Sequence, residues 1–327
     1  MKNLQTKTTV LVTGGTGFLG IHTLLQLLQQ GYDVKTTLRS LAKKDSIIKA
    51  LEEEGITDFS SLSFIEADLM SDNNWDQAVK DCDYVLHLAS PFPAQNPEDE
   101  NEVILPARDG ALRVLKASRD AGVKRVVLTS SFAAVGYSIG AKDHVFTESD
   151  WTDTDTSTNI SAYVKSKTIA EKSAWKFIEK EGNSLELTVI NPVGVFGPAI
   201  GNITSTSLDV GVSSILNGTL NYTPSFTMNI VDVRDVVDLH IKAMLHPKAS
   251  GERFIAASEG VMSFYDIVEL FKKERPQYTQ NIQPLEPIGK EFYKEISNEK
   301  AKTILQWKPR NHEESLLASI DSLMTNS

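Results

Sequence analysis

Apolar residues follow two alternating patterns along the first 190 residues. Short runs rich in Val, Ile, Leu and Thr, typical of buried strands, alternate with longer stretches in which apolar residues recur at helical spacing. Strands covered by helices on both faces are apolar almost throughout, so this pattern predicts an α/β protein with a doubly wound parallel sheet. The expected strands are 8–13, 33–38, 62–67, 84–88, 125–131 and 185–190, and the expected helices are 18–30, 43–54, 74–80, 101–121 and 162–180.

The alternation breaks after Pro192. Gly, Pro, Asn, Ser and Thr cluster over residues 194–206, and prolines interrupt the elements that follow. We expect residues 1–192 to form the sheet domain, rejoined by a strand and a helix near 228–246. Most of 193–327 is expected to form a smaller mixed C-terminal lobe. Ligands of open α/β sheets bind outside the carboxyl ends of the strands, so this lobe is the predicted substrate-binding part.

A glycine-rich turn joins the first strand to the first helix, with glycines spaced three residues apart. Glycines permit a tight turn and let backbone N–H groups approach a pyrophosphate at the positive end of a helix dipole. Such a triplet alone also fits a purely structural turn, but its place between a strand and a helix favours a dinucleotide site. The expected cofactor contacts in the turn are Gly14, Thr16, Gly17, Phe18, Leu19 and Gly20.

The end of the second strand distinguishes the two nicotinamide dinucleotides. An acidic residue there binds a ribose 2′-hydroxyl, whereas a basic residue accepts a 2′-phosphate. Arg39 stands at this end and Lys43 follows, while the nearest carboxylate, Asp33, lies at the other end of the strand. The charges favour NADPH over NADH, although a solvated basic helix start is the alternative. Asp68, which closes the third strand, could reach the adenine or cap the next helix.

A tyrosine and a lysine lie four residues apart on one predicted helix. This spacing places Tyr163 and Lys167 on the same face, with Cβ atoms about 5–6 Å apart. A neighbouring ammonium favours the phenolate, so we expect it to lower the pKa of the tyrosine and make it a competent proton donor and acceptor. On an isolated helix such a pair is commonly exposed at the surface and has no function. The preceding strand, however, ends in hydroxyl residues 129–131 at the ligand-bearing edge, which favours a site.

Together these residues resemble the extended short-chain dehydrogenase/reductases, in particular the branch of dihydroflavonol reductases, cinnamoyl-CoA reductases and yeast-type methylglyoxal or aldehyde reductases. The resemblance covers nearly the whole chain, and the combination of motifs is far more specific than any one of them. The matching segments are Thr13 to Gly20, Arg39, Asp68-Leu69, His87 to Phe92, Thr129 to Ser131, Tyr163 with Lys167, Asn191 to Val193 and Val231 to Asp235.

The resemblance implies a Rossmann-type NADP-binding domain and a reductase site. Ser131 is expected to hydrogen-bond the substrate carbonyl, Tyr163 to protonate the developing alkoxide, and Lys167 to bind the nicotinamide ribose and tune Tyr163. The hydride comes from the cofactor, so the protein contributes orientation, proton delivery and charge stabilisation. The further cofactor contacts that the resemblance implies are Lys43, Asp68, Leu69, Leu88, Ala89, Ser90, Thr129, Pro192 and Val193.

The expected reaction is reversible NADPH-dependent reduction of an aldehyde or ketone. Plant flavonoid reductases carry a polar residue soon after the serine, whereas this chain has Phe132-Ala133-Ala134, which argues against a flavonoid. Phe92, Phe132, Val193 and Phe226 could line an apolar pocket or belong to the core. Two alternatives remain: a nucleotide-sugar epimerase or dehydratase with bound NAD, against which Arg39 argues, and a non-catalytic dinucleotide-sensing protein, against which the intact tyrosine–lysine pair argues.

Composition narrows the partners and the location. The chain of 327 residues is 41% hydrophobic and 23% charged, as in an ordinary globular protein, and its net charge of −10 has the wrong sign for nucleic acid. The single cysteine excludes an internal disulfide, and six scattered histidines lack metal-ligand spacing, so no metal is expected. Without an apolar run of about 18 residues or a signal peptide, we expect a cytoplasmic protein without a membrane partner. A monomer and a homodimer are both compatible with the sequence.

Overall fold

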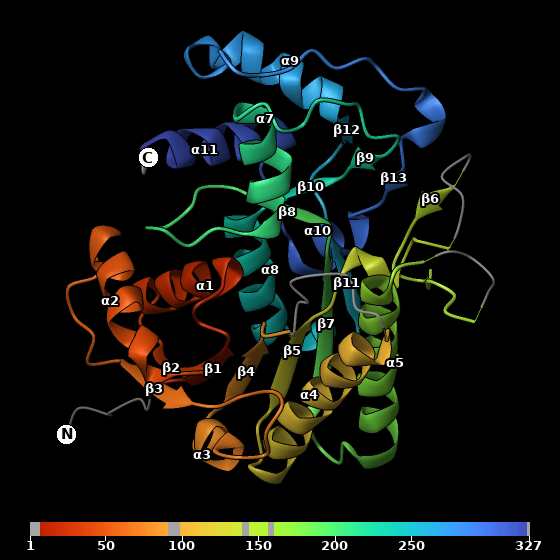
Figure 1. The fold of residues 1–327 in the computed structure, drawn as a ribbon. Helices are drawn as coiled ribbons and strands as arrows, with labels where there is room; N and C mark the ends of the chain where they lie inside the picture. Colours follow the sequence, from red (N-terminus) through yellow and green to blue (C-terminus); the bar gives the residue numbers. More distant parts are fainter. Residues whose placement is uncertain (1–6, 91–98, 139–143, 156–159, 326–327) are drawn as a thin grey trace.

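Seven parallel strands form one central sheet in the computed structural model, which describes residues 7–90, 99–138, 144–155 and 160–325 (Figure 1). Their order across the sheet is β3, β2, β1, β4, β5, β7 and β11, and every neighbouring pair is parallel. The order turns between β1 and β4, so a crevice opens beyond their carboxyl ends. The strands are β1 (Thr9–Thr13), β2 (Asp33–Leu38), β3 (Leu62–Glu66), β4 (Tyr84–His87), β5 (Arg125–Thr129), β7 (Glu186–Pro192) and β11 (Arg253–Ala256).

Helices cover both faces of the sheet, because successive side chains of each strand point to opposite sides. In β1, Val10 and Val12 pack in one apolar cluster and Leu11 in the other. The first cluster contains α1 (Phe18–Gln29), α2 (Lys44–Glu53), α8 (Val233–Leu245) and α10 (Glu299–Leu305). The second contains α3 (Trp75–Val79), α4 (Asn101–Asp120) and α5 (Ala162–Glu181).

A third apolar cluster lies in the C-terminal lobe, and Figure 1 shows its helices gathered beyond one end of the sheet. No helix in the described part of the chain is long and apolar enough to cross a membrane. The elements of the lobe are β8 (Gly194–Phe196), α6 (Thr206–Leu208), α7 (Ser214–Leu216), β9 (Thr227–Met228), β10 (Ile230–Asp232), β12 (Met262–Ser263), α9 (Phe264–Glu274) and α11 (His312–Thr325). Two further short strands, β6 (Val145–Phe146) and β13 (Glu295–Ile296), pair with each other.

The structure confirms the doubly wound parallel sheet, and the strands and helices predicted up to residue 190 lie within two residues of the observed bounds. One expectation needs correction. Helix α8 packs on the sheet as predicted, but the strand before it, β10, pairs with β8 outside the sheet. After β7 the chain leaves the sheet, and it returns to the sheet only after α8, as β11 beside β7. This strand has only four residues, which are too few to give a periodic signal.

Candidate functional site

A cleft of about 650 Å³ lies between the carboxyl ends of the strands and the C-terminal lobe. It gathers residues that are more than 180 positions apart in the chain, and it is lined by all but one of the residues that were predicted to act in catalysis or cofactor binding. These are Gly14, Thr16, Gly17, Phe18, Leu19, Gly20, Arg39, Asp68, Leu69, Leu88, Ala89, Ser90, Thr129, Ser131, Tyr163, Lys167, Pro192 and Val193.

The glycine turn at one end of the cleft fits a pyrophosphate because side chains are excluded from it. Gly14 has a φ of +79°, a left-handed conformation that favours glycine. A Cβ atom on Gly20 would lie 2.2 Å from the carbonyl oxygen of Gly14, so only glycine allows α1 to start this close to β1. Gly17 precedes α1 without a capping side chain, which leaves the first backbone N–H groups of α1 available to an anion.

One basic residue, Arg39, lines the cleft at the carboxyl end of β2. Arg39 is exposed directly after β2, and it forms no ion pair with another described residue. Asp68 accepts a hydrogen bond from the backbone N–H of Met70 through Oδ1 at 2.9 Å, so its carboxylate holds the turn after β3. Lys43, which was also predicted to contact the cofactor, is not among the residues that line the cleft. It ends the short turn Leu41–Lys43 and is exposed, because this turn leads the chain away toward α2.

Three polar side chains from two elements meet at the other end of the cleft. Ser131 follows β5 and accepts the backbone N–H of Ala133 through Oγ at 3.1 Å, which fixes the serine side chain. The same hydroxyl is hydrogen-bonded to the Tyr163 side chain on α5. One turn further along α5, the Nζ atom of Lys167 lies 5.9 Å from the centre of the Tyr163 ring. The structure therefore places a hydroxyl, a phenol and an ammonium around one point.

The protonation of this trio differs from the sequence-based expectation. Burial raises the pKa of Tyr163, and the hydrogen bond with Ser131 only partly opposes this. The net shift of the Tyr163 pKa is therefore opposite to the expected lowering, because desolvation of the buried phenol outweighs the effects that favour the phenolate. Burial lowers the pKa of Lys167 to about 8, against the opposing charge of Glu171. At neutral pH the phenol therefore keeps its proton and can act as a proton donor.

Two buried histidines fix threonines at the ends of adjacent strands. His87 lies 2.8 Å from the hydroxyl of Thr13 through Nδ1, and the backbone N–H of Ala89 donates to the same hydroxyl at 3.0 Å. His240 on α8 lies 2.7 Å from the hydroxyl of Thr129 through Nε2. Burial lowers the pKa of His87 to about 3 and that of His240 to about 4, so both rings are neutral and hold the carboxyl ends of β1 and β5 in place.

The low pKa values of the buried histidines predict that the unfolding free energy falls in mild acid. His22 on α1 is also buried, and burial lowers its pKa to about 4. The unfolded chain takes up protons near pH 6.5, whereas the folded chain resists until the pH reaches its own lower pKa values. Each of the three histidines should therefore cost about 1.4 kcal/mol of unfolding free energy per pH unit between these limits.

Urea unfolding at several pH values between about 6.5 and about 4 measures this slope. Burial raises the pKa of Glu148 and Asp235, which opposes the effect, so the decisive comparison is with a variant. In His240→Gln one of the three contributions is gone, and its unfolding free energy should decline less steeply than that of the natural chain. Equal slopes for the two proteins would show that His240 is not held neutral by the fold.

Several lining residues were not predicted from the sequence. Thr37, Ala67, Met70 and Trp75 line the cleft, and so does Ser130 beside Ser131. The C-terminal lobe contributes Val195 and the hydroxyl run Thr204 to Ser207. This run lies at the start of α6, where Ser205 caps the backbone N–H of Leu208 at 3.2 Å. Its only sequence signal was four consecutive hydroxyl residues in the stretch after Pro192.

The predicted apolar pocket is only partly formed by the residues named for it. Val193 lines the cleft, whereas Phe132 packs against Phe146 in a separate small core. Phe226 is 54% exposed and contacts Phe264 with ring centres 5.4 Å apart. Phe92 lies outside the described residues. Of the residues that do line the cleft after Pro192, Val193 and Val195 are apolar, and Thr204 to Ser207 supply hydroxyl groups.

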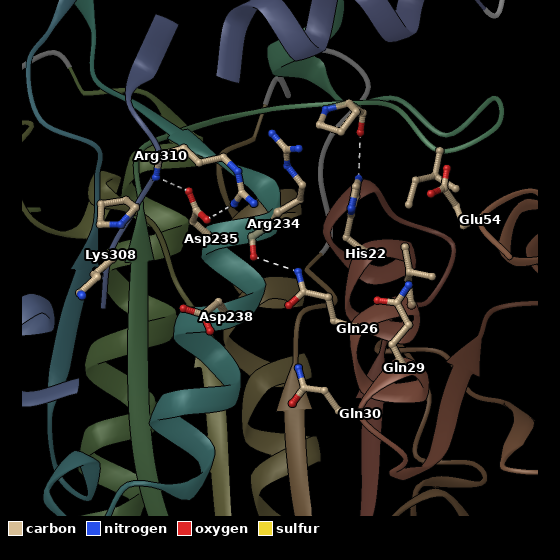
Figure 2. Close-up of a pocket in the computed structure, with 14 residues that line it drawn as sticks. His22, Gln26, Gln29, Gln30, Glu54, Arg234, Asp235, Asp238, Lys308 and Arg310 are labelled. Atoms are coloured by element: carbon tan, nitrogen blue, oxygen red, sulfur yellow. Dashed lines mark hydrogen bonds and ion pairs between the residues drawn. The ribbon is translucent and has the colours of Figure 1, made fainter. Parts of the chain in front are cut away.

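A second hollow of about 750 Å³ lies between α1, α8 and residues 308–310, and Figure 2 shows its polar lining. Its arginines already have carboxylate partners. Arg310 binds Asp235 through its guanidinium and through its backbone N–H, the latter at 2.6 Å, and Arg234 pairs with Asp232 at 2.7 Å. Gln26 donates to the carbonyl of Arg234 at 2.9 Å. These contacts tie the C-terminal segment to α8 and α1, and none of the predicted site residues takes part.

Comparison with known proteins gives a consistent result. The chain matches the NAD dependent epimerase/dehydratase family over residues 10–257. It is 35% identical to the putative NADPH-dependent methylglyoxal reductase GRP2 of Candida albicans, over 93% of this chain and 95% of the relative. It is 32% identical to the cinnamoyl-CoA reductase CAD2 of Medicago truncatula, over 96% and 95%. The yeast methylglyoxal/isovaleraldehyde reductase Gre2, solved with NADPH, superposes with a TM-score of 0.86 at 28% identity, covering 97% of this chain and 98% of that one.

Proposed function

We propose, since this chain belongs to the NAD dependent epimerase/dehydratase family, that it is an NADPH-dependent oxidoreductase that reversibly reduces an aldehyde or ketone to an alcohol. The observation that carries the proposal is the cleft itself, in which Ser131, Tyr163 and Lys167 share one cavity with the glycine turn and Arg39. The relatives named above support the cofactor and the reaction class. The side-chain geometry supports the role of each residue.

The dinucleotide fits the residues that are present. The glycine turn and the start of α1 hold the pyrophosphate, Arg39 binds the 2′-phosphate, and Lys167 binds the nicotinamide ribose, next to a wall formed by Pro192 and Val193. When bound, NADPH supplies the hydride. Because Gly20 has no side chain, α1 starts close to β1, and backbone atoms line this part of the cleft.

The chain's own groups orient the carbonyl and deliver the proton. Ser131 donates a hydrogen bond to the carbonyl oxygen and so fixes its position beside the phenol. Tyr163 gives its hydroxyl proton to the same oxygen as negative charge develops there. Lys167, charged below about pH 8, stabilises the phenolate that Tyr163 becomes. The raised pKa keeps the phenol protonated at neutral pH, which is the state that the reducing direction requires.

The division of the chain follows from this assignment. We propose that residues 1–192, completed by α8 and β11, bind the dinucleotide, and that most of 193–327 selects the substrate. Small or medium aldehydes and ketones suit the border of Val193, Val195 and the hydroxyl run. The cytoplasmic location and the state as monomer or homodimer stay predictions.

Steady-state rates with NADPH and, separately, NADH test the proposal against a panel of carbonyls. The panel contains aliphatic and aryl aldehydes, α-dicarbonyls, β-ketoesters and a dihydroflavonol. We expect oxidation of NADPH with some of these compounds and a higher kcat/KM with NADPH than with NADH. A protein that is purified with NAD bound and oxidises neither cofactor would contradict the reductase and favour an epimerase or dehydratase.

A further inference from the structure

A buried carboxylate lies directly behind the site, on the helix that carries Tyr163 and Lys167. Glu171 follows Lys167 by one helical turn on α5, and its side chain has no exposed surface. Burying an ionised carboxylate is costly unless it is fully hydrogen-bonded and paired. Glu171 meets both conditions, so its position is one that the fold is built to maintain.

The two oxygens of Glu171 bind side chains that lie on β7, on β11 and directly after β5. Oε2 accepts hydrogen bonds from Ser130 Oγ at 2.6 Å and from Asn191 Nδ2 at 2.8 Å. Oε1 accepts from Arg253 Nε on the edge strand β11, also at 2.6 Å. Ser130 immediately precedes Ser131. The carboxylate thus joins the carboxyl ends of β5 and β7 to α5 and β11.

A second link connects this network to the cleft residues. Asn191, which directly precedes Pro192, donates a hydrogen bond from Nδ2 to the backbone carbonyl of Ser131 at 3.1 Å. The positions of Ser131 and Pro192 therefore depend on residues whose side chains converge on Glu171. A displacement of about 1 Å at a reacting group can cost about 10²-fold in rate, so this anchoring matters for catalysis.

Charge provides a third link, from Glu171 to Lys167. A cavity of about 20 Å³ is lined by both side chains, together with Ser130 and His87. The negative charge of Glu171 raises the pKa of Lys167, against the stronger lowering by burial. Without this carboxylate, desolvation alone would act on the ammonium.

Other charged or titratable groups lie near Lys167 and could also change its pKa. On α5 itself Tyr163 is the other titratable neighbour, and Tyr137 faces Tyr163 with a pKa that burial raises. His87 faces Lys167 from β4 but stays neutral above about pH 3. Arg253 binds Glu171 from β11, and Glu148 accepts from the backbone N–H of Ile255 on that strand at 2.9 Å. Glu171 is therefore the carboxylate coupled most directly to Lys167 among the described residues.

We propose that Glu171 is a positioning residue of the reductase site, which anchors the strand ends bearing Ser131 and Pro192 and holds the positive charge on Lys167. This inference rests on the roles proposed above for Ser131, Tyr163 and Lys167. It adds a residue that touches neither substrate nor dinucleotide and acts through two independent routes, one geometric and one electrostatic.

The Glu171→Gln variant tests these routes. The pH profile and the titration of Lys167 distinguish their loss from a loss of the fold. Removing the charge should let Lys167 lose its proton at lower pH, so the basic limb of kcat/KM, which we expect near the Lys167 pKa of about 8 in the natural chain, should move to lower pH. An NMR titration of lysines labelled with ¹³C at Cε, in protein without dinucleotide, should show the Lys167 signal titrating at lower pH as well. The value of kcat/KM at pH 7 should fall about 10- to 100-fold.

Glu186→Gln is the matched control. Glu186 also pairs with a buried arginine, Arg125, at 2.5 Å, but this pair joins β5 and β7 at their amino ends, away from the cleft. The Glu186→Gln substitution should lower the unfolding free energy without moving the basic limb of kcat/KM or the titration of Lys167. A Glu171→Gln protein that titrates like the natural chain would overturn the electrostatic route.

Glu171→Asp tests the geometric route if the glutamine variant does not fold. Aspartate keeps the charge but withdraws the oxygens, so the Lys167 titration should stay near that of the natural chain while kcat/KM falls. Natural kcat/KM in this variant would overturn the anchoring role. Tyr163→Phe serves as the reference, because an active Tyr163→Phe protein would refute the proposed site itself, whereas an inactive one beside unaffected Glu171 variants would refute only this inference.

Discussion

Replacing Tyr163 with phenylalanine should lower kcat about 10²- to 10⁴-fold, the range that general acid catalysis contributes. The phenol holds its proton at neutral pH and is hydrogen-bonded to Ser131, so removing the hydroxyl removes the proton donor while the ring and its packing remain. Affinity for NADPH, measured by fluorescence titration, should change little, because the glycine turn and Arg39 lie at the other end of the cleft.

Tyr84→Phe is the control for this substitution. Tyr84 begins β4 at the amino end of the sheet, where Lys124 lies 5.6 Å from the centre of its ring, so the same chemical change is made away from the cleft. Turnover of this variant should match that of the natural chain. If Tyr163→Phe also turned over at nearly the natural rate, the phenol would not be the acid, and the proton would have to come from another group.

Replacing Arg39 with aspartate should weaken NADPH binding about 10- to 100-fold, whereas NADH binding should change little. A hydrogen bond to a charged group contributes about 1.5–3 kcal/mol, and the introduced carboxylate also repels the 2′-phosphate. Arg39 lines the cleft directly after β2 and makes no ion pair with another described residue, so the substitution should leave the fold intact. Dissociation constants for both dinucleotides measure the effect.

Lys43→Asp provides the matched comparison, since it makes the same charge reversal four residues further along the chain. Lys43 is exposed and does not line the cleft, so its variant should bind NADPH nearly as the natural chain does. If both variants lost the same affinity for NADPH, Arg39 and Lys43 would act only through their positive charge, and not through a specific contact of Arg39 with the 2′-phosphate. If Arg39→Asp weakened both dinucleotides alike, Arg39 would support the fold and not the 2′-phosphate.

Much of the site could be predicted because its signals are local in sequence. The glycine turn depends on residues 14–20, and the pairing of Tyr163 with Lys167 depends on one helical turn. The strand periodicity placed Ser131 and Arg39 at carboxyl ends of strands, and parallel strands bring those ends to one edge. For these residues the local pattern and the sheet topology together define the place in three dimensions.

The rest depends on contacts between distant segments, which one sequence does not reveal. Glu171 meets Arg253 across 82 residues, and β11, which carries this arginine, is too short for a periodic signal. The hydroxyl run Thr204 to Ser207 reaches the cleft only because the lobe folds over the sheet edge. The direction of the Tyr163 pKa shift was predicted wrongly because spacing says which charges are near but not how deeply the phenol is buried.

Transfer of deuterium from cofactor to product tests the central claim most directly. The natural chain is incubated with NADPH in which the transferred hydrogen at C4 is replaced by deuterium. The second reactant is an aldehyde that the rate panel identifies as a substrate. Direct reduction predicts one deuterium on the former carbonyl carbon of every alcohol molecule formed, with one NADPH oxidised for each. Alcohol without deuterium from either C4 position, or conversion of substrate without net oxidation of NADPH, would contradict the assignment as a carbonyl reductase.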